Sequence, residues 1–276
     1  MERVAITTIV LTKNEQANLS RCLASVPWSG AVVVDSGSTD ATVEVAKHCG
    51  ATVFVHEQNG PFDIAEQRNW ALASCNIDSE WILFLDADEE LTVEGVRAVE
   101  RACSCGDKYD AFELTPKFLF WGRWLKRTQG YPNWHGRLVK NIDAPFEGGV
   151  WEHFRSNLRV GKILEPYNHY GFSKGVSAWI ERHNRYSTWD GARIHAFLQS
   201  GDSGDLGTTR KLRLRRVAAR LWPIRPIVHF VYMYICRMGF TEGVPGFVYC
   251  VLCMFYEFMT VCKIYEQRRI SRGLPL

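Results

Sequence analysis

Residues 81–90 read Trp81-Ile82-Leu83-Phe84-Leu85-Asp86-Ala87-Asp88-Glu89-Glu90, five apolar residues followed by four carboxylates within five positions. The apolar run predicts a strand that is buried on both faces of a parallel sheet. The carboxylates would then follow the carboxyl end of that strand, where open α/β sheets bind ligands. Asp-x-Asp suits Mg²⁺ or Mn²⁺, which take oxygen ligands from carboxylates and nucleotide phosphates. The alternative is a polar turn that starts a helix, because acidic residues favour that end of the helix dipole.

Apolar β-branched runs alternate with helical patterns through the first third of the chain. This alternation predicts an α/β fold, with a parallel sheet covered by helices. The expected strands are residues 4–11, 31–34, 51–55 and 81–85, and the expected helices are residues 16–26, 41–49 and 61–73.

Charged residues follow the ends of these strands. Glu15, Asp35 and the Asp86/Asp88 pair come directly after strands, and Arg68 lies in the helix before the fourth strand. Because the carboxyl ends of parallel strands meet at one edge, a nucleotide could bridge these side chains. The sequence contains neither G-x-G-x-x-G nor G-x-x-x-x-G-K-[ST], so the dinucleotide fingerprint and the P-loop are both absent. A metal on Asp88 would neutralise the phosphates instead.

The amino-acid composition further narrows the classes of protein to which the chain could belong. The chain has 276 residues, 46% of them hydrophobic, which is enough for one large α/β domain or a domain with an extension. A net charge of +3 is too small to indicate nucleic-acid binding by itself. Nine cysteines, an odd number without a regular framework, together with the lack of a signal peptide, indicate a reducing compartment.

Four segments, residues 7–15, 34–40, 65–71 and 83–89, resemble in order and spacing the four signatures of family 2 glycosyltransferases of the GT-A fold. Within that family the chain is most similar to lipopolysaccharide-core glucosyltransferases of the KdtX/WaaE type, along most of its length. The resemblance implies a Rossmann-like GT-A domain for a nucleotide sugar. We expect this catalytic domain at residues 1–200, with a nucleotide-sugar half at about 1–105 and an acceptor half at about 106–200.

The resemblance also implies roles for single residues. Ordinary helix capping is the alternative for Thr12, and turn formation is the alternative for Asp35. Glu89 and Glu90 are expected to begin the next helix. The implied roles are base and ribose binding for Thr12 and Glu15, base binding for Asp35, base or phosphate binding for Arg68, ribose and metal binding for Asp86, and binding of Mg²⁺ or Mn²⁺ for Asp88.

Inverting sugar transfer requires a base that takes the proton of the attacking acceptor hydroxyl. Our candidate is Glu152, in the segment Gly148-Gly149-Val150-Trp151-Glu152-His153. Relatives carry His-Glu or a similar acidic pair here, so the order Trp-Glu-His departs from the family pattern. Asp143 and Glu147 are the alternative bases, and a surface carboxylate in a loop is the alternative for Glu152.

Two further residues are assigned through the resemblance. His169 matches the late histidine that often completes the metal site, although a lone histidine is more often structural. Arg185 lies in a helix expected at residues 174–189 and matches a late basic segment that could close over the diphosphate; a solvated basic face is the alternative. Aromatic residues at 118–124, interleaved with Arg and Lys, favour either sugar binding or core packing.

The last part of the chain, residues 201–276, is expected to be a helical region that associates with membranes. Residues 200–209 resemble a lid or linker, and residues 208–225 are basic and amphipathic, which suits an anionic membrane surface. Nucleic-acid binding is the rival use of such a run, but no nucleic-acid motif accompanies it. Residues 227–240 and 244–262 are apolar, and Glu257 in the second favours helices that lie in the interface over a true span. Burial on the catalytic domain or in a dimer is the alternative.

Together these patterns predict an inverting, metal-dependent glycosyltransferase on the cytoplasmic face of the inner membrane. The resemblance implies UDP-glucose as the donor and a lipid-linked glycan, the inner core of lipopolysaccharide, as the acceptor. One alternative keeps the chemistry and uses a polyprenyl-diphosphate-linked sugar; another is a non-catalytic nucleotide-sugar-binding scaffold at the membrane. We expect no nucleic-acid partner, and homo-oligomerisation stays open.

Overall fold

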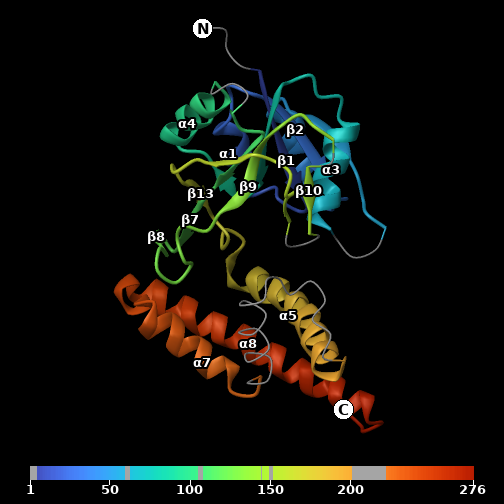
Figure 1. The fold of residues 1–276 in the computed structure, drawn as a ribbon, viewed down its shortest axis with the longest axis vertical. Coiled ribbons are helices and arrows are strands. Elements are labelled where there is room, and N and C mark those ends of the chain that lie inside the picture. The colour runs from blue at the N-terminus through green and yellow to red at the C-terminus, as the bar shows by residue number, and fades with distance from the viewer. Residues whose placement is uncertain (1–4, 60–62, 105–107, 144, 149–151, 201–221) are drawn as a thin grey trace. The chain divides into compact units, whose positions relative to one another are not determined.

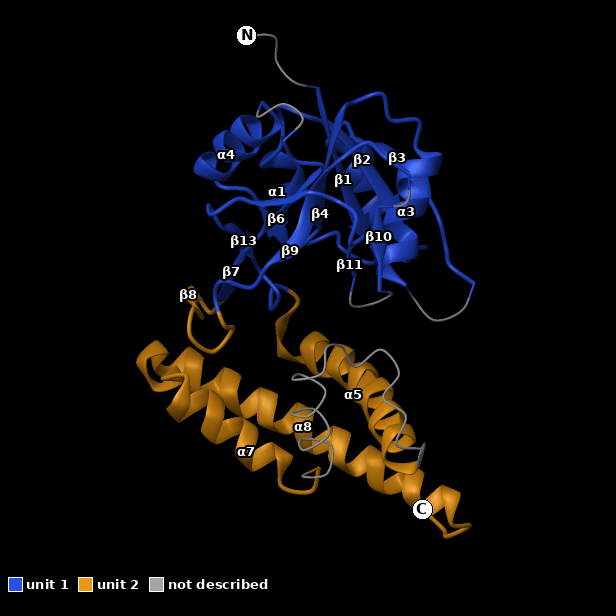
Figure 2. Cartoon of the chain, viewed as in Figure 1, with its two compact units in different colours: residues 1–119, 131–173 blue, residues 120–130, 174–276 orange. Residues whose placement is uncertain are grey.

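The computed structural model describes residues 5–59, 63–104, 108–143, 145–148, 152–200 and 222–276 (Figure 1). The chain forms two compact units: unit 1 comprises Met1–Leu119 and Tyr131–Ser173, and unit 2 comprises Phe120–Gly130 and Lys174–Leu276 (Figure 2). From the sequence we expected the boundary at residue 200, whereas the boundary between these two units falls after Ser173. The reason is that α5 (Gly175–Ser200) packs against α8 (Gly243–Ser271) and belongs to the helical unit.

Unit 1 is built on a central mixed sheet, which among the described residues has seven strands in the order β12-β6-β9-β4-β1-β2-β3. Strands β1, β2, β3 and β4 are parallel, and β9 runs antiparallel between β4 and β6. The strands are β1 (Ile6–Thr12), β2 (Gly30–Asp35), β3 (Thr52–Val55), β4 (Trp81–Asp86), β6 (Ala111–Leu114), β9 (His135–Lys140) and β12 (Val160–Lys162).

Helices cover both faces of this sheet. Buried residues of α1 (Leu19–Ala24), α2 (Thr42–His48) and α4 (Val93–Cys103) join one apolar cluster, and those of α3 (Ile64–Ser74) join the other. Two of the helices start at side-chain caps: Asp63 accepts from the Glu66 N–H, and Thr92 accepts from the Gly95 N–H. The structure thus confirms the predicted α/β class.

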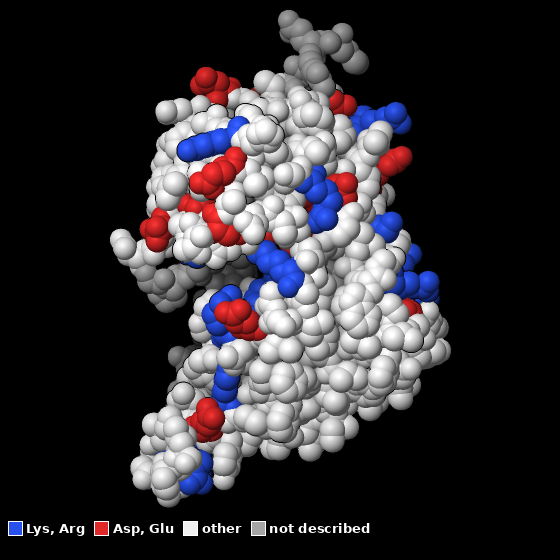
Figure 3. All heavy atoms as spheres, turned by 180° about the vertical axis from the view of Figure 1, so that it is seen from behind, with Lys and Arg blue, Asp and Glu red and all other residues white. Residues whose placement is uncertain are grey.

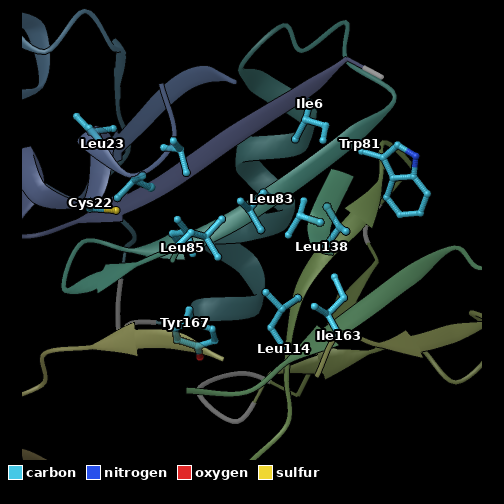
Figure 4. Packing of buried hydrophobic residues seen from close by; sticks show 14 of the residues in the cluster. Ile6, Cys22, Leu23, Trp81, Leu83, Leu85, Leu114, Leu138, Ile163 and Tyr167 are labelled. Atoms are coloured by element: carbon cyan, nitrogen blue, oxygen red, sulfur yellow. The ribbon is translucent and has the colours of Figure 1, made fainter. Parts of the chain in front are cut away.

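Strand β4 is buried on both faces, as its unbroken apolar sequence predicts. Trp81, Leu83 and Leu85 belong to one cluster, where they pack with residues such as Leu138 (Figure 4). Ile82 and Phe84 point into the other cluster. Because successive side chains point to opposite faces, one short strand anchors both cores and fixes the position of Asp86 at its end.

A smaller sheet lies after β4. The chain turns through Ala87 and Asp88 into β5 (Glu89–Glu90), which pairs with β13 (Tyr167–His169); β13 in turn pairs with β7 (Pro116–Phe120). The expectation that Glu89 and Glu90 begin a helix is therefore wrong. The helix begins only at Val93, because Thr92 provides its cap. A third pairing joins β10 (Phe146–Glu147) to β11 (His153–Phe154).

Unit 2 is mostly helical. Besides α5 and α8 it contains the short strand β8 (Arg123–Trp124), α7 (Arg225–Val231), a π-helical turn (Tyr232–Cys236) and a 3₁₀ turn (Gly239–Glu242). The 3₁₀ turn and α8 together, residues 239–271, are long and apolar enough to cross a membrane, and their most apolar 18-residue window has a mean hydropathy of 1.7. Both predicted apolar segments are thus largely helical, and the helix is interrupted near the end of the first segment, at Arg237 and Met238, where Met238 is left-handed. The predicted linker and most of the basic run, residues 201–221, lie outside the described residues.

The acid within the apolar helix α8 is neutralised inside unit 2. Glu257 is 4% exposed, and its carboxylate receives the Arg225 guanidinium at 2.7 Å. His229 lies 3.9 Å from the same carboxylate. Arg225 and His229 both come from α7, so the charged side chains of α7 lie against the acidic side chain of α8. A buried charge requires such a partner.

Candidate active site

Three predicted site residues, Thr12, Asp35 and Asp86, are the last residues of β1, β2 and β4. In the strand register Thr12 lies opposite Asp35, and Leu11 lies opposite Asp86. Parallel pairing therefore brings the ends of three strands, far apart in sequence, to one edge of the sheet. This edge is the part of an open α/β sheet where ligands bind.

Asp35 organises the loop that follows β2. One carboxylate oxygen accepts the Thr12 hydroxyl at 2.8 Å and the Ser38 hydroxyl at 2.5 Å. The other accepts the N–H groups of Gly37 and Ser38, at 3.0 and 2.7 Å. Thr12 and Asp35 are 3% and 1% exposed. Both residues therefore shape the wall of the site, and their turn-forming function exists whether or not a base binds there.

Glu15 lies in the loop after β1, next to the start of α1. Its backbone carbonyl accepts the N–H groups of Asn18 and Leu19, both at 3.0 Å. Its side chain accepts the Asn18 amide at 2.8 Å. Glu15 is half-buried, and its carbonyl and carboxylate both hold the residues at the start of α1.

Asp86 is held between two buried arginines. Arg137 of β9 donates to one carboxylate oxygen at 2.8 Å, and Arg68 of α3 lies 3.6 Å from the other. Both arginine side chains are at most 4% exposed, whereas that of Asp86 is 42% exposed. Burial would raise the pKa of Asp86, but the two guanidinium groups outweigh it and hold this pKa far below its ordinary range. Asp86 is thus a permanently charged carboxylate with a face open to a ligand.

Arg137 was missed by the sequence analysis. The same nitrogen that donates to Asp86 also donates to Glu89 at 2.5 Å, and Glu89 accepts the Asp86 N–H at 2.9 Å. Glu89 is 1% exposed, and burial raises its pKa to about 7 although Arg137 opposes this rise. A lone arginine within an aromatic-rich segment gives no local signal; only the pairing of β9 with β4 brings it to the site.

Asp88 and His169 form the candidate metal pair. Pairing of β5 with β13 places His169 opposite Glu89, and the Tyr170 N–H donates to the Asp88 carbonyl at 2.9 Å. The His169 Nε2 atom lies 3.5 Å from an Asp88 carboxylate oxygen. Burial lowers the pKa of His169, but Asp88, Glu89 and Asp86 together outweigh that effect, so the pKa lies above its ordinary value.

These donors fit a hard divalent cation that also binds a substrate. Within the described residues no group of three His, Cys, Asp or Glu side chains could hold a metal ion without other ligands. Mg²⁺ and Mn²⁺ are commonly held by one or two protein side chains, and substrate phosphates and water complete the coordination. One carboxylate and one imidazole nitrogen, with Asp86 beside them, form such a partial set.

Glu152 lies beside the same arginine cluster. Its carboxylate is 3.1 Å from Arg68, and its side chain is 13% exposed. Arg68 also donates to the Gly136 carbonyl at 3.1 Å, which fixes the guanidinium between Glu152 and Asp86. The alternative bases Asp143 and Glu147 line an open groove of about 550 Å³ along α3, together with residues such as Asn69.

A second residue without a sequence signal is His135, the first residue of β9. Burial, followed by the charge of Arg137, lowers its pKa to about 4. Its Nε2 atom lies 3.0 Å from the Asn133 side-chain amide nitrogen. His135 is therefore a neutral imidazole at physiological pH, two residues before Arg137 on the same strand.

Arg185 is placed differently from the other candidates. It lies on α5, in unit 2, whereas the other predicted site residues all belong to unit 1. Its side chain is 64% exposed and lies 3.9 Å from Glu181, one helical turn before it. The proposed contact with the diphosphate stays a prediction.

Comparison with known proteins repeatedly finds glycosyltransferases. Residues 7–101 match the family described as Glycosyl transferase family 2. An uncharacterized glycosyltransferase of Rickettsia typhi is 27% identical over 273 residues, which cover 98% of this chain and 89% of that protein. The lipopolysaccharide core biosynthesis glycosyltransferase LpsC of Rhizobium meliloti is 24% identical over 282 residues, which cover 98% of this chain and 95% of that protein.

Among solved structures, glucosyl-3-phosphoglycerate synthase from Mycobacterium tuberculosis, in complex with Mn²⁺, UDP and glucosyl-3-phosphoglycerate, has a TM-score of 0.39 at 18% identity. The match covers 50% of this chain and 57% of that one, so this chain spans little more than half of that protein. The family match, together with the sheet described above, confirms the GT-A fold class that the four motifs predicted. The chain thus carries a glycosyl transferase family 2 domain, which includes the strand ends that form the site.

Proposed function

We propose that this protein is an inverting, metal-dependent glycosyltransferase that transfers glucose from UDP-glucose to the inner core of lipopolysaccharide. The observation that carries the proposal is the juxtaposition of the Asp88–His169 pair with Asp86, which Arg68 and Arg137 keep charged. The name of the relative LpsC supports the acceptor class, because that protein is described as acting in lipopolysaccharide core biosynthesis.

Each group at the site has a defined task in this reaction. Asp88 and His169 would hold Mg²⁺ or Mn²⁺, which supplies charge neutralisation for the departing diphosphate. Asp86 would accept hydrogen bonds from the ribose hydroxyls through its open face. Arg68 and Arg137 would keep Asp86 ionised and oriented, and the loop shaped by Thr12 and Asp35 would enclose the base, with Glu15 at its rim.

Glu152 is the proposed base. The acceptor hydroxyl oxygen attacks the anomeric carbon, the bond from that carbon to the diphosphate oxygen breaks, and the hydroxyl proton passes to the Glu152 carboxylate. Arg68, 3.1 Å away, would orient this carboxylate and take no part in the bond changes. Attack from the face opposite the leaving group gives inversion.

Unit 2 would place the enzyme where its acceptor lies. Large apolar side chains of α7 and α8 are exposed, including Ile227 at 65%, Val244 at 69% and Phe258 at 54%. Figure 3 shows a broad area of unit 2, the lower body in that view, without Lys, Arg, Asp or Glu. Exposed apolar surface of this kind is typical of membrane or protein contacts. We propose monotopic attachment to the cytoplasmic face of the inner membrane.

The test is a panel of nucleotide sugars with purified protein, scored by protection against thermal unfolding and by release of the nucleoside diphosphate. We expect UDP-glucose to protect only with Mn²⁺ or Mg²⁺, and Asp88→Asn to lose this metal-dependent protection while the free protein unfolds at the same temperature. Protection of Asp88→Asn equal to that of the wild type would refute the metal site.

Glu152→Gln separates catalysis from binding. Removal of a general base lowers turnover by roughly 10²–10⁴-fold while the donor still binds. Glu147→Gln and Asp143→Asn are the matched controls, because both change a carboxylate that lines the groove along α3. Full activity in Glu152→Gln with loss in either control would reassign the base. Donor binding without transfer to lipopolysaccharide or polyprenyl-linked acceptors would favour the scaffold alternative.

A further inference from the structure

We propose that the loop Phe120–Gly130 inserts Trp121 into the surface of an anionic bilayer, as a membrane-contacting element of unit 2 in addition to α7 and α8. This inference rests on the membrane attachment proposed above and specifies which residues determine it. The loop and the apolar helices belong to the same compact unit.

The backbone at Trp121 is unusual for a bulky residue. Trp121 has φ = 48° and Gly122 has φ = 75°, so both central residues of the turn between β7 and β8 are left-handed. Turns of this kind favour Asn-Gly or Gly-Gly, because a Cβ atom is crowded in this region. A tryptophan at such a position costs conformational free energy, and strain of this kind concentrates at functional positions.

The Trp121 side chain is held out from the protein surface. It is 60% exposed, while its neighbour Phe120 is fully buried. The two rings stack with centroids 4.5 Å apart and an interplanar angle of 23°. Trp121 thus rests on a fixed platform and presents most of its apolar surface to the surroundings.

Buried hydrogen bonds fix this loop to the start of α8. Glu242 is 4% exposed, and its carboxylate accepts the Arg127 N–H at 2.5 Å. It also accepts the Thr128 N–H at 3.2 Å and the Thr128 hydroxyl at 2.7 Å. Gln129 donates to the Tyr249 hydroxyl at 2.5 Å. The loop is therefore attached to the helix end whose neighbouring side chains, Phe240 and Val244, are 51% and 69% exposed.

The charges of the loop suit anionic lipid. Arg123, Lys126 and Arg127 are exposed, and residues 120–130 contain no Asp or Glu. A tryptophan beside basic residues and exposed aliphatic side chains is the composition of segments at the membrane–water interface. Each basic residue near an anionic leaflet adds attraction that salt weakens. Sugar binding by Trp121, one of the two alternatives that the sequence left open for residues 118–124, is an outcome of the test below.

The experiment uses the full chain and vesicles of phosphatidylcholine with or without phosphatidylglycerol. Trp121→Asn places a residue suited to the left-handed turn, so we expect its melting temperature to equal or exceed that of the wild type. We expect its affinity for phosphatidylglycerol-containing vesicles to fall about tenfold, as loss of one large buried aromatic side chain would cause. Trp189→Asn is the control, since Trp189 is 43% exposed on α5 of the same unit.

A second measurement is fluorescence quenching by brominated lipids. The difference in fluorescence between the wild type and Trp121→Phe gives the emission of Trp121. We expect brominated lipids to quench this part of the emission. Wild-type affinity in Trp121→Asn, or an equal loss in Trp189→Asn, would overturn the loop proposal and leave membrane attachment standing. Unchanged vesicle binding with weakened glycan binding would instead assign Trp121 to the acceptor. A wild-type protein that binds neither vesicle would refute membrane attachment itself.

Discussion

A single guanidinium nitrogen of Arg137 neutralises the charge of two carboxylates. It donates to Asp86 and Glu89, and Glu89 is almost completely buried. Loss of this guanidinium would leave the buried Glu89 carboxyl without its cation, so that it either stays charged at a high free-energy cost or takes up a proton. At this site, charge balance is thus set by one residue outside the recognised motifs.

We predict that Arg137→Met lowers the free energy of unfolding by about 3–5 kcal/mol, as breaking a buried ion pair from one side does. Urea denaturation measures this loss. The double variant Arg137→Met/Glu89→Met should recover a large part of it, because no unpaired carboxyl group remains buried at position 89.

The control for that prediction is an exposed pair. Arg101 and Glu165 are 3.3 Å apart, with side chains 65% and 38% exposed. Arg101→Met should cost less than about 1 kcal/mol. Equal losses in the two single variants, or no recovery in the double variant, would contradict the assignment of Arg137 as the compensating charge.

Single residues differ in how far the sequence alone could assign them. Asp86 and Asp88 are found because the strand that positions them and the carboxylates themselves are adjacent in sequence. Arg137 and His135 are not found, since their contacts depend on the antiparallel pairing of β9 with β4. Glu89 is misassigned because an acidic residue before a helix and one in a short strand have the same local composition.

At the scale of elements, an ion pair fixes the edge strand β12 to β6. Asp110 accepts from the Arg159 backbone N–H at 2.9 Å and from its side chain at 2.9 and 2.7 Å. These hydrogen bonds lower the pKa of Asp110 from 3.8 to about 2. An acid whose pKa is lower in the folded state contributes stability above its unfolded pKa and loses it as the pH falls through the folded value.

We therefore predict that Asp110→Asn costs about 1 kcal/mol at pH 7, allowing for the exposure of Arg159. The difference between the variant and the wild type should persist down to about pH 4 and disappear as the pH approaches about 2. Urea titrations at several pH values measure it. A difference that stays constant to the lowest pH would show that the ionised carboxylate is not its cause.

The junction between the 3₁₀ turn and α8 leaves no room for a side chain at Gly246. A Cβ atom there would lie 2.6 Å from the Gly239 carbonyl oxygen and 2.6 Å from the Glu242 Cβ. We predict that Gly246→Ala destabilises unit 2 by about 1–3 kcal/mol, although alanine favours helices. Val244→Ala, at an exposed position two residues earlier, should have a much smaller effect. Thermal denaturation compares the two, and equal midpoints would contradict the packing described.

Elements were predicted best where pattern and burial coincide. Strand β4 and the apolar helices α7 and α8 follow from continuous apolar runs. Strand β5 could not be predicted, because a strand of two residues, Glu89–Glu90, is defined by its partner β13 and not by its own sequence. Helix α5 extends well beyond its predicted end at Trp189 because α8 supplies a surface for its later turns.

At the scale of the whole molecule, each unit has its own buried cluster: residues around β4 in unit 1, and Ile194 with Ile264 in unit 2. We predict two calorimetric transitions in detergent solution. UDP with Mn²⁺ should raise only one midpoint, because a ligand stabilises the unit that binds it. Gly246→Ala should lower only the other midpoint. A single transition that responds to both changes would show that the units unfold together.

The pairing of β5 with β13 has a consequence for protein engineering. The matched family segment ends at residue 101, yet His169, opposite Glu89, comes from well beyond it. A chimera that joins the donor half of one relative to the acceptor half of another exchanges one side of this pairing without the other. With the proposed metal site, such hybrids should keep the loop shaped by Asp35 but lose metal affinity, unless positions 137 and 169 are transplanted together with positions 88 and 89.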